Sequence, residues 1–106
     1  MMRGVVILSE DAESIIRAEH HDPFSYLGMH PVEMEGRKLV VVRAFIPEAQ
    51  TADVMDIERG GIAFPMEKIH PDGLFEVFIE DQQKVFPYRI KTTDFYGNVS
   101  EFHDPY

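Results

Sequence analysis

One stretch of the sequence indicates the class of fold: residues Lys38 to Ile46, which read KLVVVRAFI and stop at Pro47. β-Branched residues favour strands, and a short apolar run bounded by a proline is typical of a largely buried strand. From Arg37 onward the apolar side chains follow a period of about 2 rather than the helical period of about 3.6. The stretch therefore predicts a core β-strand, followed by a chain that is mostly β.

Further short strands follow at spacings of about 10 residues, with turn residues between them. Leu74 to Glu80 reads LFEVFIE and comes directly after the tight-turn sequence His70-Pro71-Asp72-Gly73. Pro65 interrupts Ile62 to Ile69, which is expected at a sheet edge or to begin late. The other candidates are Ala52 to Ile57, Tyr88 to Thr92 and Val99 to Phe102, with a hairpin turn at Tyr96 to Asn98. Six or so such strands predict an all-β fold, an antiparallel β-sandwich.

A short helix is expected before the strands. Ser9 is a suitable N-cap, and acidic residues follow it in the first turn, where the helix dipole favours them. The helical spacing of Ala12, Ile15 and Ile16 predicts a helix from about Glu10 to about Glu19, with these three side chains on its buried side. Pro23 is expected to end it.

Composition limits the classes of function. The 106 residues suit one domain, 44% are hydrophobic, the formal net charge is −9 and there is no cysteine. An acidic surface repels nucleic acid and anionic lipid, whereas a neutral sugar polymer feels little of this charge. The apolar stretch Gly4 to Leu8 is shorter than a signal-peptide core, and no apolar run is long enough to span a membrane. We therefore expect a cytoplasmic protein that binds neither nucleic acid nor membrane.

Motifs for catalysis or cofactors are weak. His20-His21-Asp22 groups three metal-ligand types, but neighbouring residues at a helix end point in different directions, so a polar helix terminus is favoured. The serines lack a nucleophile elbow, and no lysine-serine or lysine-threonine pair follows Gly60-Gly61. The sequence predicts no catalytic residue, no metal site and no cofactor.

Aromatic residues at a turn are the remaining candidates. The chain has eight phenylalanines and four tyrosines, and Phe95 and Tyr96 fall at a predicted turn, where burial is difficult. Aromatic faces stack on sugar rings, and a turn asparagine can bond sugar hydroxyls, so Phe95, Tyr96 and Asn98 are the candidate carbohydrate-binding residues. The alternative is that Phe95 folds back and packs on its own hairpin.

Several segments resemble a known family when they are taken in order. His21 to His30 (HDPFSYLGMH) resembles the segment that opens the N-terminal domain of bacterial glycogen (1,4-α-glucan) branching enzymes. The matching segments that follow are Val41 to Ala49, Asp72 to Glu76, and a closing part with Tyr88-Arg89-Ile90, the pattern D-x-x-G-N-V at Asp94 to Val99, and Asp104-Pro105-Tyr106. The ordered combination covers about residues 19 to 106.

This resemblance implies a family 48-type carbohydrate-binding domain with an immunoglobulin-like sandwich over residues 21–106, preceded by an N-terminal helical segment, residues 1–20. The chain would be a fragment of a longer enzyme that transfers α-1,4-glucan chains to form α-1,6 branches. The catalytic barrel of that enzyme is absent here. Implied partners are α-1,4-glucan or glycogen and the following domains of the same polypeptide.

Several alternatives remain open. The chain has no tryptophan, and Ser100 stands where several branching enzymes carry one. A spacer or docking role that influences the length of chain transferred is therefore the alternative to direct glucan binding. A free-standing glucan-targeting or protein-docking sandwich, and the equivalent module of a debranching or trehalose-releasing enzyme, are the other interpretations.

Overall fold

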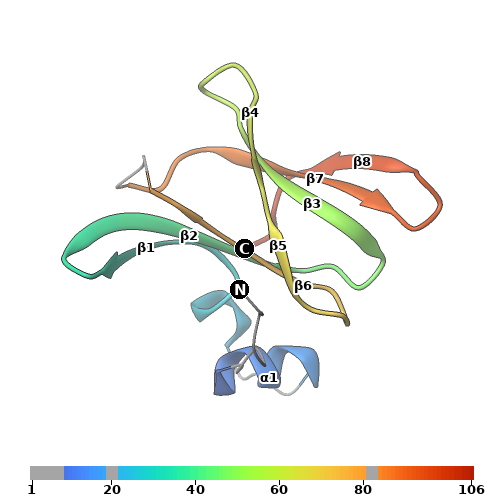
Figure 1. Cartoon of the computed structure of the whole chain (residues 1–106), viewed down its shortest axis with the longest axis horizontal. Helices are drawn as coiled ribbons and strands as arrows, with labels where there is room; N and C mark the ends of the chain where they lie inside the picture. Colours follow the sequence, from blue (N-terminus) through green and yellow to red (C-terminus); the bar gives the residue numbers. More distant parts are fainter. Residues whose placement is uncertain (1–8, 19–21, 81–83) are drawn as a thin grey trace, which may run out of the picture.

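Two four-stranded antiparallel sheets make up the fold in the computed structural model, which describes residues 9–18, 22–80 and 84–106 (Figure 1). Sheet A has the order β1 (Gly28–Met34), β2 (Arg37–Phe45), β6 (Leu74–Ile79) and β5 (Glu67–His70). Sheet B has the order β4 (Ile62–Pro65), β3 (Ala49–Asp56), β7 (Tyr88–Asp94) and β8 (Val99–Phe102). The predicted all-β sandwich is confirmed.

Strand β2 is buried on both faces. Val40, Val41 and Val42 each have no exposed surface. Because successive side chains of a strand point to opposite faces, β2 needs apolar cover on both sides of sheet A. Sheet B covers the inner face, where Val42 and Phe75 of sheet A pack in one core with Val54 and Ile90 of sheet B.

Helix α1 (Glu10–Ile16) and the 3₁₀ helix η1 (Pro23–Ser25) cover one end of the outer face. Ala12 and Ile15 of α1 pack in a second cluster with Tyr26, Leu27 and Leu74. Ser9 caps α1 as predicted, since its Oγ accepts a hydrogen bond of 3.1 Å from the Ala12 N–H. The helix lies below the sheets in Figure 1.

The helix is shorter than predicted. It ends at Ile16 rather than near Glu19, and Ala18 takes a left-handed conformation, φ 59°, while its N–H donates to the Ile15 carbonyl. A left-handed residue just past the last turn ends a helix. Pro23 therefore does not set this end, and Glu19 lies outside the described residues.

Two strand predictions also need correction. Ile62 to Ile69 is not one strand, because the chain leaves β4 at Pro65 and joins the other sheet as β5. Both pieces are edge strands, as the proline indicated. Strand β1 was not predicted; it tolerates Pro31 because it forms an edge of sheet A.

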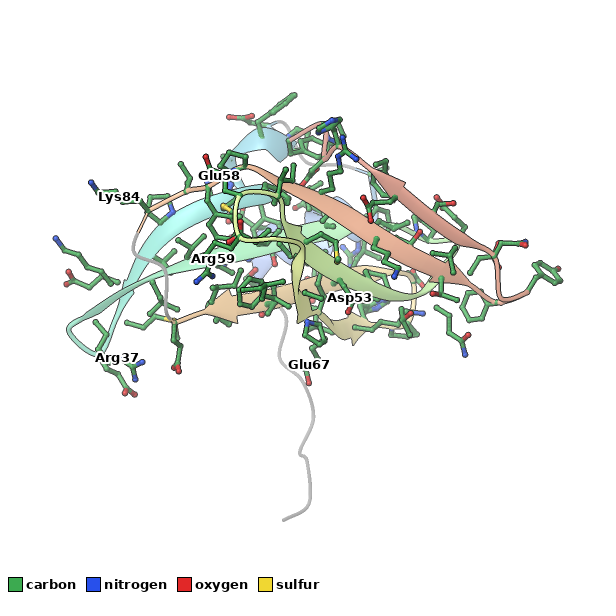
Figure 2. The ribbon with its side chains drawn as sticks, turned by 90° about the horizontal axis from the view of Figure 1, so that it is seen from above. Arg37, Asp53, Glu58, Arg59, Glu67 and Lys84 are labelled. Atoms are coloured by element: carbon green, nitrogen blue, oxygen red, sulfur yellow. The ribbon has the colours of Figure 1, made fainter. Side chains whose placement is uncertain are left out.

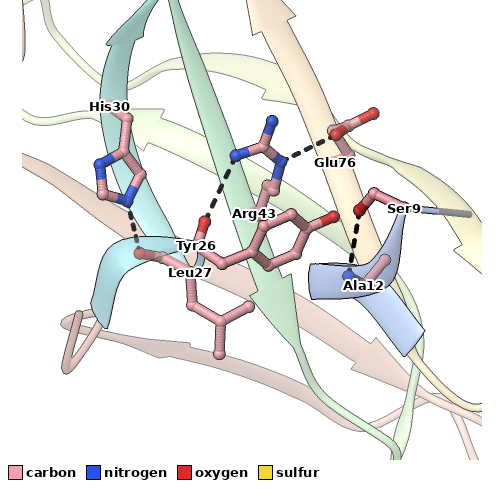
Figure 3. Close-up of polar contacts among 7 residues, drawn as sticks. All are labelled: Ser9, Ala12, Tyr26, Leu27, His30, Arg43 and Glu76. Carbon is pink, nitrogen blue, oxygen red and sulfur yellow. Dashed lines mark hydrogen bonds and ion pairs between the residues drawn. The ribbon is translucent and has the colours of Figure 1, made fainter. Parts of the chain in front are cut away.

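A polar clamp joins η1 to sheet A (Figure 3). Arg43 of β2 donates from Nε to Glu76 Oε2 of β6 over 3.0 Å and from Nη1 to the Tyr26 carbonyl over 3.4 Å. Its guanidinium carbon also lies 4.4 Å from the centroid of the Tyr26 ring. One arginine thus holds two strands and the segment after η1 together.

Gly73 permits the close approach of two loops. Its φ is +112°, and its carbonyl accepts a hydrogen bond of 2.8 Å from the Ile46 N–H. A Cβ at this position would lie 2.6 Å from the Ile46 carbonyl oxygen and 2.6 Å from Pro47 Cα. Only glycine fits between the β5–β6 turn and the end of β2.

We expect Gly73→Ala to destabilise the fold by about 1–3 kcal/mol more than Gly61→Ala, through overpacking against backbone. Gly61 is the matched control, because its φ is +78° but nothing lies within 4 Å of a Cβ built there. Urea unfolding of both variants measures the difference. Equal losses of stability would mean that strained φ, and not the contact with Ile46 and Pro47, is the whole effect.

Candidate functional site

The turn between β7 and β8 brings the three predicted site residues together. The Asp94 N–H donates to the Asn98 carbonyl over 2.9 Å, and the Gly97 N–H donates to the Asp94 carbonyl over 3.1 Å. Gly97 has a φ of +88°, which glycine adopts without strain. Phe95 and Tyr96 are therefore at the tip of a closed turn, which projects from the sandwich at the right of Figure 1.

Asp94 fixes the shape of this turn. Its Oδ1 accepts hydrogen bonds from the Tyr96 N–H over 2.8 Å and from the Asn98 N–H over 2.9 Å. The Asn98 N–H, more than any other group, lowers the pKa of the Asp94 carboxyl, and the side-chain N–H of Asn98 adds to the effect. This role of Asp94 was not predicted, although an aspartate that opens a glycine-asparagine turn is a recognisable signal.

The two aromatic rings differ in their surroundings. Tyr96 is 92% exposed, so its ring is available to a ligand. Phe95 is 60% exposed, and the Nζ of Lys68 from β5 lies 4.9 Å from its ring centroid. The same Nζ lies 5.5 Å from the core ring of Phe75. Lys68 therefore links the turn of sheet B to sheet A, a long-range contact that no local sequence pattern signals.

Asn98 is positioned differently from the two rings. Its Nδ2 donates to Asp94 Oδ2 over 3.1 Å, so this N–H group holds the turn.

The candidate site as a whole is an exposed aromatic tip on a turn whose shape polar groups already fix. Such a surface can stack on the apolar face of a neutral ring with little loss of conformational entropy.

The buried carboxylate of Asp56 has a structural role. Its Oδ1 accepts from the backbone N–H groups of Glu58 and Arg59, and its Oδ2 accepts from Arg59 Nε over 2.8 Å. Figure 2 labels Glu58 and Arg59 on this β3–β4 turn. Both Asp56 oxygens are thus occupied in holding the turn, which explains how a charged group can be 1% exposed.

Over residues 9–18, 22–80 and 84–106, no three histidine, aspartate or glutamate side chains gather as metal ligands would. His20 and His21 of the candidate cluster lie outside these residues. None of the helices described there has the length and apolar character needed to cross a membrane.

Comparison with protein families gives a match over almost the whole chain. Residues 8–106 match the family described as alpha-1,4-glucan branching enzyme GlgB, N-terminal domain. The chain belongs to this family of GlgB N-terminal domains. The resemblance of the ordered segments to branching enzymes is therefore confirmed.

Proteins similar to this chain are named as GlgB branching enzymes. A 1,4-alpha-glucan branching enzyme GlgB of Bradyrhizobium sp. (strain ORS 278) is 40% identical over 99 residues, which are 93% of this chain and 12% of that protein. The GlgB of a Nostoc species is 37% identical over 106 residues, 99% of this chain and 13% of that protein. That of Methylococcus capsulatus is 36% identical over 99 residues. The chain thus spans about one eighth of the length of these GlgB enzymes.

The segments that resemble GlgB domains contain residues that fix the backbone. Gly73 fits where a side chain would collide, and Asp94 shapes the β7–β8 turn. Asp104 accepts a hydrogen bond from the Tyr88 hydroxyl and another, of 3.1 Å, from the Tyr106 N–H. These residues therefore hold the backbone of the matching segments in place.

Removing the Asp94 carboxylate should loosen the turn and lower the melting temperature. The pKa of Asp94 is lower in the folded chain than in the unfolded one, so its stabilising contribution is present above about pH 4 and is lost as pH falls through the lowered pKa. The difference in melting temperature between wild type and Asp94→Ala should be constant above about pH 4 and shrink below it. An Asp94 carboxyl resonance that titrates at the ordinary aspartate pKa in NMR spectra would contradict this.

Proposed function

We propose that this chain is the non-catalytic N-terminal module of a 1,4-α-glucan branching enzyme and that its β7–β8 turn contacts glucan. The observation that carries the first part of this proposal is the family match over residues 8–106. The branching enzymes that it resembles are about eight times longer, which leaves room for the chemistry elsewhere in the polypeptide.

The proposed enzyme breaks an α-1,4 bond of a glucan donor and joins the released chain to a 6-hydroxyl of an acceptor. An α-1,6 bond forms between the released chain and the acceptor. The oxygen freed from the broken α-1,4 bond takes the proton that the acceptor 6-hydroxyl loses, so no water is consumed. The catalytic groups of this reaction would belong to parts of the polypeptide outside residues 1–106. A remote glucan contact would select which chains are long enough to reach both sites at once.

Three properties favour the turn as the glucan contact. Tyr96 presents its ring to solvent, Asp94 holds the turn in one conformation, and Lys68 beside Phe95 offers an ammonium donor for a hydroxyl. A neutral glucan is not repelled by the net charge of −9. With no tryptophan in the chain, any stacking on sugar falls to tyrosine and phenylalanine.

The first experiment uses the complete parent polypeptide on linear amylose. We expect new α-1,6 linkages in the proton NMR spectrum and short chains after enzymatic debranching. Deleting residues 1–106 should leave branching in place and change the distribution of transferred chain lengths.

Two results would contradict this proposal. A folded parent that forms no α-1,6 linkage is not a branching enzyme. A deletion variant that melts normally but loses all branching would mean that residues 1–106 are required for the chemistry.

The second experiment separates glucan contact from a spacer role. Titration with maltoheptaose should shift the amide resonances of residues 95–98, and Tyr96→Ala should weaken binding about fivefold, the loss of about 1 kcal/mol of stacking. Because Tyr96 is 92% exposed, its truncation should leave the melting temperature unchanged. Ile57→Ala is the control, since Ile57 is also an exposed apolar side chain but lies just after β3.

The pattern of the shifts decides between the two roles. Shifts confined to other residues would refute the placement at the turn. No shift anywhere at saturating glucan would leave the module as a spacer.

A further inference from the structure

We propose that a groove beside Tyr106 is the docking surface for the domain that follows in the same polypeptide. This inference rests on the proposed function, because it takes the chain to be the first part of a longer branching enzyme. The groove has a volume of about 250 Å³ and lies between α1, η1, the end of β2 and the last residue. Its lining residues are Ile15, Ala18, Pro23, Leu27, Phe45 and Tyr106.

The chemistry of the groove is unlike that of the rest of the chain. All of its lining residues lack a charge, whereas 27% of the sequence is charged and the net charge is −9. An exposed aromatic pair flanks it: Phe24 is 60% exposed, and its ring packs edge-on against Tyr106 at 4.9 Å. An uncharged, partly aromatic hollow on an acidic domain fits an apolar protein segment.

The last residues are fixed against the domain at this place. The Tyr88 hydroxyl donates to Asp104 Oδ2, and Asp104 Oδ1 accepts from the Tyr106 N–H over 3.1 Å. The Tyr106 backbone packs closely on Gly28. A Cβ added to Gly28 would lie 2.9 Å from the Tyr106 carbonyl carbon. The polypeptide therefore reaches the groove in a set position.

This geometry selects the occupant. The GlgB proteins that the chain resembles are about eight times longer, so in the proposed enzyme the next segment starts at the groove. A short tether gives that segment a high effective concentration there, which no separate partner has. The following domain, presenting an apolar side chain, is thus the occupant that we propose.

Ala18→Asn in the parent enzyme tests the docking. Ala18 has a φ of 59°, a conformation that asparagine tolerates, so the domain should melt as wild type while a polar amide enters the groove. We expect proteolysis just after Tyr106 to become about threefold to tenfold faster and the small-angle scattering profile to show a more extended particle.

Glu35→Asn is the matched control. Glu35 also has a positive φ, 52°, but lies in the β1–β2 turn, the end of sheet A that Arg37 marks in Figure 2. This turn follows the seven residues of β1 and is therefore about 20 Å from η1. The control should keep the wild-type proteolysis rate and scattering profile.

A second variant, Phe24→Asp, places a charge at the exposed rim and should act in the same direction as Ala18→Asn. If both variants give the cleavage rate and scattering profile of wild type, the groove is not an interdomain contact.

Branching of amylose is measured on the same wild-type parent. A parent that does not branch but shows the docking response would overturn the proposed function and leave this inference standing.

Discussion

The two-sided burial of β2 is the constraint on which the rest of the structure depends. Val41 faces away from sheet B, yet it is as inaccessible as Val40 and Val42, which lie on either side of it. A strand with apolar side chains on both faces cannot be the solvated layer of a simple two-layer sandwich. At the Phe45 end of β2, α1 and η1 add a partial third layer over this outer face, where Phe45 packs against a cluster that contains Ala12, Ile15 and Leu74.

Polar groups fix the position of this added layer on sheet A. The short helices bury little apolar surface by themselves, since α1 has seven residues and η1 has three. Arg43 compensates by joining Glu76 and the Tyr26 carbonyl, with its own side chain only 20% exposed. A charge-assisted hydrogen bond in such a half-buried place fixes orientation, which apolar packing alone leaves loose. The position of η1 then determines where Tyr106 can pack and where the groove forms.

Sequence patterns predicted those features of the structure that have local causes. Three features that depend only on neighbouring residues were predicted: the β-branched strand at Val40 to Val42, the Asp72-Gly73 turn and the Ser9 cap. The change of sheet after Pro65 depends on hydrogen bonds between distant strands, and the end of α1 depends on the left-handed Ala18. The proximity of Lys68 to Phe95, which joins the two sheets, likewise could not be read from spacing. The turn that places Phe95, Tyr96 and Asn98 together was predictable, whereas the contacts of each side chain were not.

The family pattern and the candidate glucan contact occupy different positions of the same turn. The pattern D-x-x-G-N-V fixes Asp94, Gly97 and Asn98, and these are the residues whose hydrogen bonds and positive φ shape the turn. Its two open positions are Phe95 and Tyr96, whose rings face solvent. Because these rings are exposed and the side-chain hydrogen bonds of the turn come from Asp94 and Asn98, we expect changes at the tip to cost little in folding. Residues that shape the turn therefore need not be the residues that contact a ligand, and the chemistry of the tip has to be tested in this chain itself.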